Sequence, residues 1–520
     1  MLDWILFILL LVSWLCSFAM LTVYNTHMFQ LNSYKPHEQR VWYRDKFLPA
    51  FVGRNLGVIF TLPLLCFCGR AGMILSILLY ALTAYLGRPR KAKKPLVYTA
   101  RVKRMLATDG VLTALTILAA VLLHRWPLAF GVLLPVAHFV SGFYLLAANW
   151  LNKPIERAIN NWYINDAKRM IDSSPNLKVV GITGSYGKTS VKFFLRKLLS
   201  ARYNVLMTPE SYNTTMGVVK TIRNSLRPTH EIFLCEMGAR NIGDIKEICD
   251  IVSPRYGIIT SIGPQHLESF KTVDNVIKTK FELRDALPQD GIVFLNGDNE
   301  YIRSQNPGRK AVTYGIEKED CDYVARNISV SAKGSTFTVS RDGEDYTFTT
   351  ALIGSHNVLN ITGAIAVANT LGVPMRDLIP QVRALESVPH RLQLIRGRNA
   401  LIIDDAYNSN PSGAKAALDT LSRFDGVKIL VTPGMVELGT KQAELNRQFG
   451  RQAAAVCDYV ALVGEKQTEP IYQGLMDEGY PKEKIFVEHD LTAALKSVEN
   501  LRTGGVQKIV LLENDLPDNF

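Results

Sequence analysis

Long apolar runs fill much of the first 152 residues, and they constrain the fold of this chain more than any other feature. The first run, Trp4–Tyr24, is nearly uncharged and has about the length that a helix needs to cross a bilayer. No basic segment precedes it and further apolar runs follow it, so a cleaved signal peptide is disfavoured. The later runs are Leu56–Gly69, Ala71–Leu86, Val111–Leu123 and Leu128–Leu151. The sequence therefore predicts an α-helical transmembrane domain of about five helices over residues 1–152.

The net charge of +12 comes from the same region. Residues 1–170 carry 19 of the 59 lysines and arginines but only 6 of the 47 aspartates and glutamates, so the rest of the chain is close to neutral. A diffuse binder of polyanions would carry its excess charge on its folded domains. We therefore expect no nucleic-acid partner.

The basic residues gather in three segments, 25–55, 88–108 and 152–169. Such segments stay on the cytoplasmic side of multi-pass proteins and attract anionic lipid. With five spans, the N-terminus would face outward and everything after residue 152 would lie in the cytoplasm. We expect a multi-pass protein of the inner, or cytoplasmic, membrane, with membrane lipid as one partner.

The pattern of the remaining two thirds of the chain predicts two α/β domains. Short apolar strands alternate with helical patterns, which is typical of a parallel sheet. Residues 311–352 instead alternate polar and apolar side chains between turn signals, as antiparallel hairpins do. The α/β pattern then starts again near Ala400. We expect a cytoplasmic linker at 153–176, a central P-loop domain with a parallel sheet at 177–388, and a Rossmann-like C-terminal domain at 389–520.

A glycine-rich segment, Gly181-Ile-Thr-Gly-Ser-Tyr-Gly-Lys-Thr-Ser190, lies between a predicted strand and a predicted helix, as a P-loop does. Its glycines let backbone N–H groups turn toward phosphate oxygens at the helix N-terminus. Lys188 would reach the β- and γ-phosphates of ATP, and the Thr189 hydroxyl would bind Mg²⁺. The strict spacing asks for glycine where this chain has Ile182, so an ordinary strand–helix turn is the alternative.

Two further residues follow predicted strands. Glu236 ends the apolar run Ile232–Cys235, and an acid at the end of a buried strand near a P-loop is placed to hold Mg²⁺. His266 follows another strand, although a lone histidine is more often a structural or surface residue than a ligand.

Seven short motifs occur in order after residue 172. They are Thr183-Gly-Ser-Tyr-Gly-Lys-Thr189, the strand that ends at Glu236, Gln265-His-Leu-Glu-Ser-Phe270, Lys278-Thr-Lys-Phe-Glu282, Gly354-Ser-His-Asn-Val-Leu-Asn360, Pro389-His-Arg391 and Asp404-Asp-Ala-Tyr-Asn-Ser-Asn-Pro411. This ordered set resembles the Mur ligases, most closely the MurF type, which adds D-Ala-D-Ala to the muramoyl tripeptide. The resemblance covers about residues 172–520, and seven ordered motifs are far more specific than one P-loop.

The resemblance implies an ATP-dependent acid–amino-acid ligase that works through an acyl phosphate and a tetrahedral intermediate. It implies two Mg²⁺ ions, the first served by Thr189 and Glu236 and the second by His266 and Lys280. Lys280 matches a lysine that the family carbamylates, which turns a cation into an anion able to hold Mg²⁺. From its position alone, Lys280 is a helix lysine, most often solvated. Lys188, Lys280 and His266 would be the catalytic residues.

The same resemblance implies the nucleotide contacts. The P-loop would bind the phosphates, two asparagines would contact the adenine region, and residues of the second domain would close over the phosphates and ribose. The P-loop residues are Gly184, Ser185, Gly187, Lys188, Thr189 and Ser190, and the asparagines are Asn357 and Asn360. The residues of the second domain are Arg391, Asp405, Tyr407 and Asn408. For Arg391 and Asp405, a surface salt bridge is the alternative.

The chain departs from the MurF pattern in three places. That type carries an N-terminal domain that grips the UDP-sugar, and here the predicted membrane domain stands in its place. The loop Val431–Gly439 lacks the aspartate usual before Met435, and His390 stands where glycine is common. The last two changes fall in the domain where the incoming amine would bind, so its identity stays open.

Together these features predict a membrane-anchored, MurF-like ligase in cell-wall or peptidoglycan precursor synthesis. Its partners would be an envelope precursor with a lipid-linked or UDP-linked carboxylate, an amino acid or dipeptide amine, and a membrane partner protein. Variants are D-Ala-D-Ala addition to the UDP-precursor, extension of a γ-linked polymer, and amidation of a cell-wall precursor.

Two other function classes are alternatives. For an ATP-driven membrane transporter, acidic or basic residues would line the path inside the spans, and we expect none there. For a nucleotide-binding scaffold without catalysis, we would expect the site residues to be lost. The joint presence of Lys188, Glu236, His266, Lys280 and Asp405 disfavours that reading.

Overall fold

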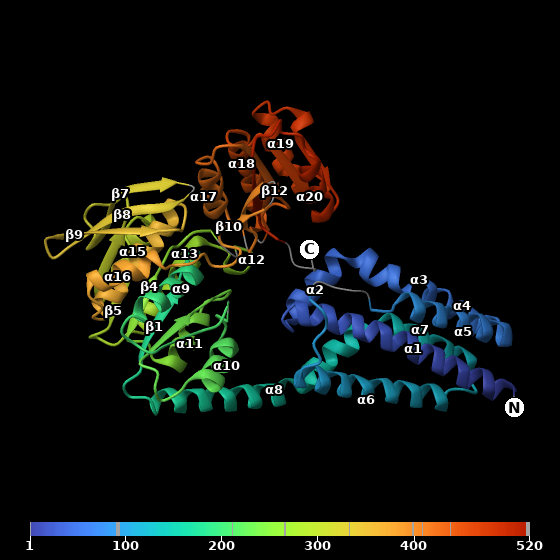
Figure 1. Cartoon of the computed structure of the whole chain (residues 1–520). Coiled ribbons are helices and arrows are strands. Elements are labelled where there is room, and N and C mark those ends of the chain that lie inside the picture. Colours follow the sequence, from blue (N-terminus) through green and yellow to red (C-terminus); the bar gives the residue numbers. More distant parts are fainter. Residues whose placement is uncertain are drawn as a thin grey trace. The chain divides into compact units, whose positions relative to one another are not determined.

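The computed structural model describes residues 2–89, 94–210, 212–264, 267–331, 333–397, 400–407, 409–436 and 438–515. These residues form two compact units, one that runs to Asn161 and one that begins at Trp162 (Figure 1).

The N-terminal unit is a bundle of helices. Its elements are α1 (Leu2–Leu31), α2 (Pro36–Asp45), a π-helical stretch η1 (Phe47–Val52), α3 (Gly53–Ile59), α4 (Thr61–Phe67), α5 (Gly69–Leu86), α6 (Ala100–Leu122), α7 (Pro127–Phe139) and α8 (Ser141–Asp172). In α1 the buried side chains recur every three or four residues, as Leu10, Trp14 and Phe18 do. Apolar side chains between them, such as Ile8 and Val12, are exposed. A helix that is apolar on all sides is typical of a membrane span.

Three helices, α1, α5 and α6, are long and apolar enough to cross a membrane. The pair α7 and α8 passes the same test together but is bent by 70° where the two helices meet, which gives a fourth candidate. The expected second span falls on α3 and α4, which have 7 residues each, whereas a span needs about 20. The five-span topology therefore stays a prediction. Much of the expected linker is the continuous helix α8.

The expectation of spans without ionisable side chains is wrong. Asp109, near the middle of α6, is 4% exposed and accepts a hydrogen bond from the Thr22 hydroxyl. His138 in α7 is fully buried, 2.8 Å from Ser17 Oγ and 2.9 Å from Asn55 Oδ1. Long apolar runs hide single polar residues, because one such residue barely changes the mean hydropathy of a span.

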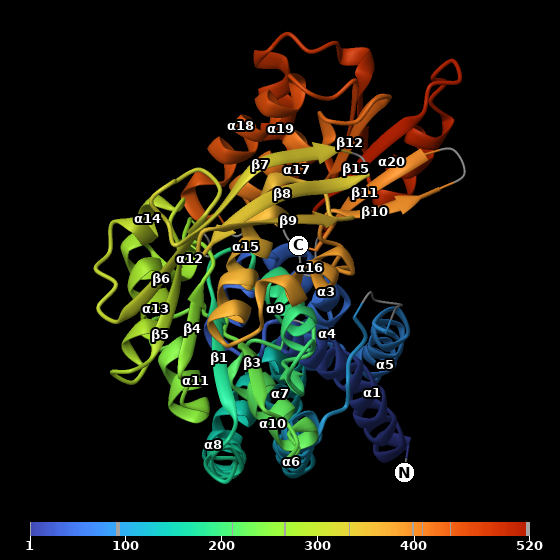
Figure 2. The ribbon, with the colours of Figure 1, turned by 60° about the vertical axis from the view of Figure 1, so that its left-hand side comes forward.

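The second unit begins with a nine-stranded sheet of order β2-β3-β1-β4-β5-β6-β7-β8-β9 (Figure 2). Neighbours from β2 to β7 are parallel, while β8 is antiparallel to both β7 and β9. The strands are β1 (Lys178–Thr183), β2 (Val205–Met207), β3 (Ile232–Glu236), β4 (Tyr256–Ile259), β5 (Ile292–Asn296), β6 (Lys310–Gly315), β7 (Tyr323–Ser331), β8 (Gly334–Arg341) and β9 (Glu344–Thr350). The expected parallel sheet and the expected hairpins are both confirmed.

Helices cover both faces of this sheet. They are α9 (Lys188–Leu199), α10 (Thr215–Ser225), α11 (Asp244–Val252), α12 (Leu267–Phe270), α13 (Val273–Asp285), α14 (Glu300–Arg303), α15 (Ser355–Thr370) and α16 (Met375–Arg383). Side chains alternate along a strand, so Val180 packs in the core beneath α9 and α15, while Val179 packs in the core beneath α10 and α11. The sheet is buried on both faces, which explains the continuous apolar sequence of its strands.

A six-stranded sheet of order β10-β11-β15-β12-β13-β14 forms the core of the C-terminal domain. All neighbours are parallel except β10, which is antiparallel to β11. The strands are β10 (Gln393–Arg396), β11 (Ala400–Asp405), β12 (Val427–Thr432), β13 (Tyr459–Val463), β14 (Ile485–Glu488) and β15 (Lys508–Glu513). The helices are α17 (Pro411–Leu421), η2 (Gly439–Lys441), α18 (Gln442–Ala454), α19 (Glu465–Asp477), η3 (Lys482–Lys484) and α20 (Leu491–Asn500).

Close packing of α18 on α19 gives a direct test of this domain. A Cβ at Gly450 would lie 2.2 Å from the backbone oxygen of Ile471, so Gly450→Ala forces the two helices apart. We expect a loss of about 1–3 kcal/mol of stability, measured as a lower thermal midpoint of the full chain in detergent. Gln448→Ala, on the exposed face of the same helix, is the matched control. Equal midpoints for both variants would contradict this packing.

Candidate active site

The predicted P-loop joins β1 to α9, as the sequence indicates. Gly184 and Gly187 have backbone φ angles of 151° and 81°, which residues other than glycine rarely adopt. A Cβ at Gly184 would also lie 2.2 Å from Thr260 Oγ1. Glycine is therefore required where the loop turns into the helix.

The loop rests on the segment that follows β4. The backbone N–H of Ser185 donates to the Ser261 carbonyl at 2.7 Å, and the Tyr186 N–H donates to the Ser261 hydroxyl at 2.9 Å. The Ser185 hydroxyl donates to the Gly263 carbonyl at 3.2 Å. Ser185 thus braces the loop through two bonds. Ser190, in the first turn of α9, lies at the helix end whose unpaired N–H groups favour anions.

Lys188 lies over its own loop. Its Nζ donates to the carbonyl oxygens of Gly184 at 2.6 Å and Ser185 at 3.0 Å. Removal from water lowers the pKa of Lys188 to about 8, against the opposing charge of Glu236. The positive charge of Arg391, from the C-terminal domain, lowers it further. An anion between Lys188 and Arg391 would relieve this repulsion.

Glu236 is fully buried at the end of β3 and gathers three partners. The Thr189 hydroxyl donates to its Oε1 at 3.2 Å, and the Asn213 side-chain amide donates to the same oxygen at 3.0 Å. Lys192 Nζ lies 2.9 Å from Oε2, and both side chains of this ion pair are almost completely buried. The structure thus brings Thr189 and Glu236 together, as their positions after β1 and at the end of β3 predict.

Lys192 and Asn213 were not predicted as site residues. Lys192 lies four residues after Lys188, so both project from one side of α9, and that spacing was the available signal. Asn213 lies in a loop, and no sequence pattern marks it.

Lys280 lies on α13 and is 2% exposed. The alternative of an ordinary solvated lysine therefore does not hold for Lys280. Among the described residues, no carboxylate lies within ion-pair distance of its Nζ. Burial and the nearby charge of Lys188 lower the pKa of Lys280 well below its ordinary range. An unpaired buried lysine of this kind is a candidate for chemical modification to a neutral or anionic form.

The two expected adenine-region asparagines occupy different positions. Asn360 lies against the P-loop, because a Cβ at Gly187 would approach its Oδ1 to 2.7 Å. Asn357 is buried and donates to the backbone oxygen of Ile353 at 2.8 Å, which fixes the start of α15. Two other predicted residues, His266 and Asn408, lie outside the described residues.

Three predicted residues of the C-terminal domain lie together. The Arg391 guanidinium stacks on the Tyr407 ring at 4.2 Å. Asp405 accepts a hydrogen bond from the Leu392 N–H at 3.2 Å, and the charge of Arg391 acts on its carboxyl group. In place of an isolated surface salt bridge, the structure gives Arg391 an aromatic contact and Asp405 a backbone donor.

The backbone conformation at His390 accounts for the glycine that is common at this position in the MurF type. Its φ is 58°, in the left-handed region that favours glycine. Its Nδ1 lies 2.8 Å from Asp404 Oδ2, a contact that compensates for the strained backbone of this turn.

Glu513 and Asn514, at the end of β15, were missed by the sequence analysis. The Asn514 side chain accepts from the Ser409 N–H at 3.2 Å and donates to the Gly434 carbonyl at 2.6 Å, so it ties together the loops after β11 and β12. Glu513 is 1% exposed and accepts a hydrogen bond from the Ser409 hydroxyl. The sequence signal that could have identified Glu513 is its position as an acid directly after the apolar run that ends at Leu512.

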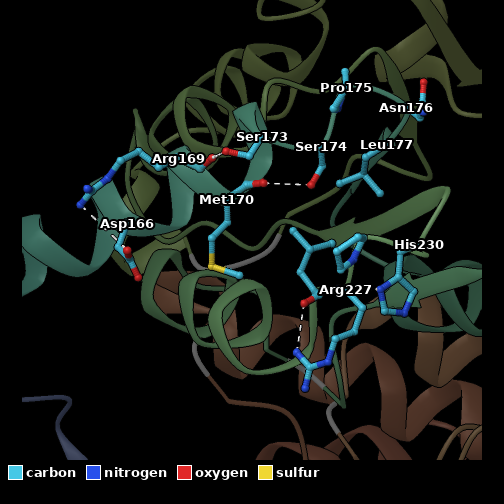
Figure 3. A pocket seen from close by; sticks show the side chains of 12 residues that line it. Asp166, Arg169, Met170, Ser173, Ser174, Pro175, Asn176, Leu177, Arg227 and His230 are labelled. Carbon is cyan, nitrogen blue, oxygen red and sulfur yellow. Dashed lines mark hydrogen bonds and ion pairs between the residues drawn. The ribbon is translucent and has the colours of Figure 1, made fainter.

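A separate cavity of about 520 Å³ lies within the second unit, beside the last turns of α8 (Figure 3). The last turns of α8, the segment before β1 and the segment before β3 line it, with Arg169 and Arg227 among the lining residues. It lies at the amino ends of β1 and β3, whereas the P-loop follows the carboxyl end of β1. This cavity is therefore not part of the predicted nucleotide site.

Two family models match the second unit. The Mur ligase middle domain matches residues 182–368, and the Mur ligase, glutamate ligase domain matches residues 390–512. Both matches begin after the helical N-terminal unit.

The chain is also similar to curated proteins named UDP-N-acetylmuramoyl-tripeptide--D-alanyl-D-alanine ligase. It is 32% identical over 294 residues to that of Escherichia coli (strain K12), which covers 56% of this chain and 65% of that protein. It is 30% identical over 276 residues to that of Bacillus subtilis (strain 168), which covers 52% and 59%. The chain thus spans less than two thirds of the length of these relatives.

Solved structures agree. MurF from Acinetobacter baumannii matches with a TM-score of 0.63 and 26% identity, over 68% of this chain and 77% of that chain. MurF from Thermotoga maritima in complex with ADP matches with a TM-score of 0.61 and 28% identity, over 68% and 80%. With two domain models of one family matched in order along the second unit, the chain belongs to the Mur ligase family.

Proposed function

We propose that this chain is a membrane-anchored, ATP-dependent ligase of the MurF type. It would join the carboxylate of a cell-wall precursor to the amine of an amino acid or dipeptide through an acyl phosphate. The observation that carries the proposal is the contact between Thr189 of the P-loop and the buried carboxylate of Glu236, because a hydroxyl and an acid at a phosphate loop can hold the metal ion that phosphoryl transfer needs. The charge of Arg391, from the C-terminal domain, also acts on Lys188.

The nucleotide would bind with its phosphates on the loop from Gly184 to Thr189. The ADP complex of the Thermotoga maritima MurF supports this assignment. In this chain, the loop offers a helix N-terminus, the Lys188 ammonium and the Arg391 guanidinium. These groups neutralise the charge that spreads over the phosphoryl oxygens during transfer.

A first Mg²⁺ fits between Thr189 and Glu236, since a hydroxyl and a carboxylate are the oxygen ligands that Mg²⁺ prefers beside phosphates. Glu236 is the stronger of the two ligands, and Lys192 and Asn213 fix its orientation. When bound, the ion would neutralise phosphate charge. No group of three histidine, cysteine, aspartate or glutamate side chains among the described residues forms a metal site on its own. The phosphates would therefore have to supply further ligands.

A second Mg²⁺ would need an anion at Lys280. A carbamate there fits the surroundings, because the lysine is buried, has no ion-pair partner among the described residues and lies near the Lys188 charge. A negative carbamate would attract Lys188, whereas the free ammonium repels it. His266 is the other proposed ligand of this ion.

Water must be kept from an acyl phosphate, since hydrolysis would waste it. We place the boundary between the two ligase domains at residues 388 and 389, between α16 and β10. Closure of the C-terminal domain there, with Arg391 on the closing face, would exclude water and bring the amine to the carbonyl carbon.

The N-terminal unit would act as a membrane domain over residues 1–152, joined by a linker over residues 153–176. Its place at the start of a MurF-type chain supports a lipid-linked carboxylate, delivered at the membrane surface. The curated relatives are named for a UDP-linked tripeptide and D-alanyl-D-alanine, so UDP-precursor, γ-linked polymer and amidation chemistry are the variants to compare.

A transporter is the second candidate function, and one observation favours it. Asp109 and His138 are ionisable side chains buried within candidate spans, where such groups often mark a transport path. His138, however, has hydrogen-bond partners on two other helices, which is also what a structural contact between helices requires.

One assay separates these functions. The purified full chain is incubated with ATP, Mg²⁺ and D-Ala-D-Ala or single amino acids, with either UDP-linked or extracted lipid-linked precursors, and ADP release and product mass are measured. We expect ADP release that needs both an acid and an amine. Absence of product with every pair, together with ATP-dependent uptake into vesicles, would instead establish the transporter.

Lys280→Ala tests the carbamate. We expect the loss of its charge to lower the ligation rate by at least about 100-fold, within the range for removal of an electrostatic group from an active site, and short carboxylic acids to restore part of it. Lys278→Ala is the matched control, because Lys278 is exposed on the same helix. Full activity of Lys280→Ala would refute the role.

The membrane topology is tested by cysteine labelling. In a chain with Cys16, Cys66 and Cys68 changed to serine, we expect Arg125→Cys to react with an impermeant maleimide in intact cells. Lys103→Cys, at the other end of α6 and also exposed, should react only after permeabilisation. The reverse pattern would overturn the orientation inferred from the basic loops.

A further inference from the structure

The buried ion pair between Lys192 and Glu236 shares its carboxylate with the proposed first Mg²⁺ site. Lys192 Nζ lies 2.9 Å from Glu236 Oε2, and the two side chains are 0% and 1% exposed. The other oxygen, Oε1, accepts hydrogen bonds from Thr189 and Asn213. Oε2 accepts none among the described residues, so the lysine charge alone compensates for its burial. A cation of the chain itself therefore already offsets the charge of Glu236.

Lys192 is held firmly beside this carboxylate. It lies one turn after Lys188 on α9, and its side chain is completely buried. Its Nζ also donates to the backbone carbonyl of Glu210, in the loop between β2 and α10. To leave, the ammonium group would have to abandon both partners in a dry interior, which costs free energy. The lysine charge therefore stays next to Glu236 when a ligand arrives.

The protein groups around the proposed metal ion bring no net negative charge. Thr189 supplies a neutral hydroxyl, Lys192 offsets Glu236, and Lys188 adds a positive charge at the same end of α9. A divalent cation needs anionic oxygens in place of the water that it gives up. Like charges a few ångströms apart repel strongly when bulk water is excluded. These charges disfavour a bare cation and favour one that arrives with phosphate oxygens.

We propose that Lys192 makes metal binding at Glu236 depend on the nucleotide. With this lysine in place, the site takes a divalent cation only together with the phosphates of ADP or ATP. Lys192 is then a positioning residue that acts through Glu236 and touches neither the metal ion nor the nucleotide. The inference rests on the proposed ligase function and adds an order of binding to it, in which the metal ion does not bind first.

A purely structural role for the pair is the alternative, and it predicts a change of the opposite sign. If Lys192 only locks α9 against β3, its removal would let Thr189 and Glu236 move apart. Binding of the bare cation would then weaken. If the lysine charge repels the cation, its removal strengthens that binding. The sign of the change therefore separates the two roles.

The test measures Mn²⁺, which prefers the same oxygen ligands as Mg²⁺, on the full-length protein in detergent. Equilibrium dialysis gives the Kd for Mn²⁺ without nucleotide and with saturating ADP. Glu236→Gln removes the charged ligand, so Mn²⁺ that this variant still binds lies elsewhere and is subtracted. The test variants are Lys192→Met and Lys192→Arg. Lys197→Met is the matched control, because Lys197 is exposed on the same helix.

In the wild-type protein, we expect Mn²⁺ to bind at least about tenfold more tightly with ADP than without it. Without nucleotide, Lys192→Met should bind Mn²⁺ at least about tenfold more tightly than the wild type, because a repelling charge is gone. The ratio of the two Kd values should fall accordingly. Lys192→Arg keeps the charge, so it should retain most of the ratio, and Lys197→Met should retain all of it.

Thermal unfolding gives a second readout that does not depend on catalysis. Lys192→Met leaves Glu236 as a lone buried charge, which lowers stability. We expect Mn²⁺ alone to raise the thermal midpoint of this variant, because the metal ion replaces the lost charge. The wild-type midpoint should respond only to Mn²⁺ with ADP. The double variant Lys192→Met/Glu236→Gln has no lone charge, so it should fold without metal and show no such rise.

Three results would overturn the inference. The first is a wild-type protein that binds Mn²⁺ equally well with and without ADP. The second is a Lys192→Met protein whose nucleotide-free binding of Mn²⁺ is unchanged or weaker. The third is a Lys192→Met protein that Mn²⁺ does not stabilise although the double variant folds. If the wild-type protein binds neither ADP nor Mn²⁺ with ADP, the nucleotide site and the proposed function fail, which differs from all three.

Discussion

The buried ion pair between Lys192 and Glu236 is the contact on which the candidate active site depends. Both side chains are almost completely excluded from water, and either charge left alone there would cost several kcal/mol. The pair therefore locks α9 against the carboxyl end of β3. Because α9 begins with the P-loop, the same contact sets Thr189 beside Glu236 and fixes the phosphate loop relative to the groups that can hold a metal ion.

Several positive charges gather around this fixed point. Lys188 lies over the P-loop, and the charge of Arg391, from the C-terminal domain, acts on both Lys188 and the Asp405 carboxyl group. Lys280 adds a further buried cation near Lys188. Positive groups thus gather at the P-loop, where an anion between Lys188 and Arg391 would relieve their repulsion.

Prediction from sequence succeeded wherever local pattern and motif coincide. The strand before the P-loop, the glycines of its turn and the acid that ends β3 all follow from short-range rules, and the structure places each of them where the sequence predicts it. The burial of Lys280 was not predictable, because a lysine on a helix is expected to be solvated until the elements that cover it are known. Glu513 was missed for a related reason: its partner Asp405 is more than a hundred residues away in the chain, and only strand pairing brings the two together. Asp109 and His138 were overlooked because apolar neighbours mask single polar residues.

The sequence by itself determined the kinds of element and their order: apolar helices first, then two α/β domains with a P-loop in the first of them. Those features depend on hydrophobic periodicity and on glycine, which act over a few residues. The tertiary structure alone decided which charges meet. Parallel strands bring their carboxyl ends to one edge of a sheet, so residues from β3, β11 and β15 acquire neighbours that no short stretch of sequence specifies. Burial at that edge then decides how strongly each charge shifts the pKa of its neighbour.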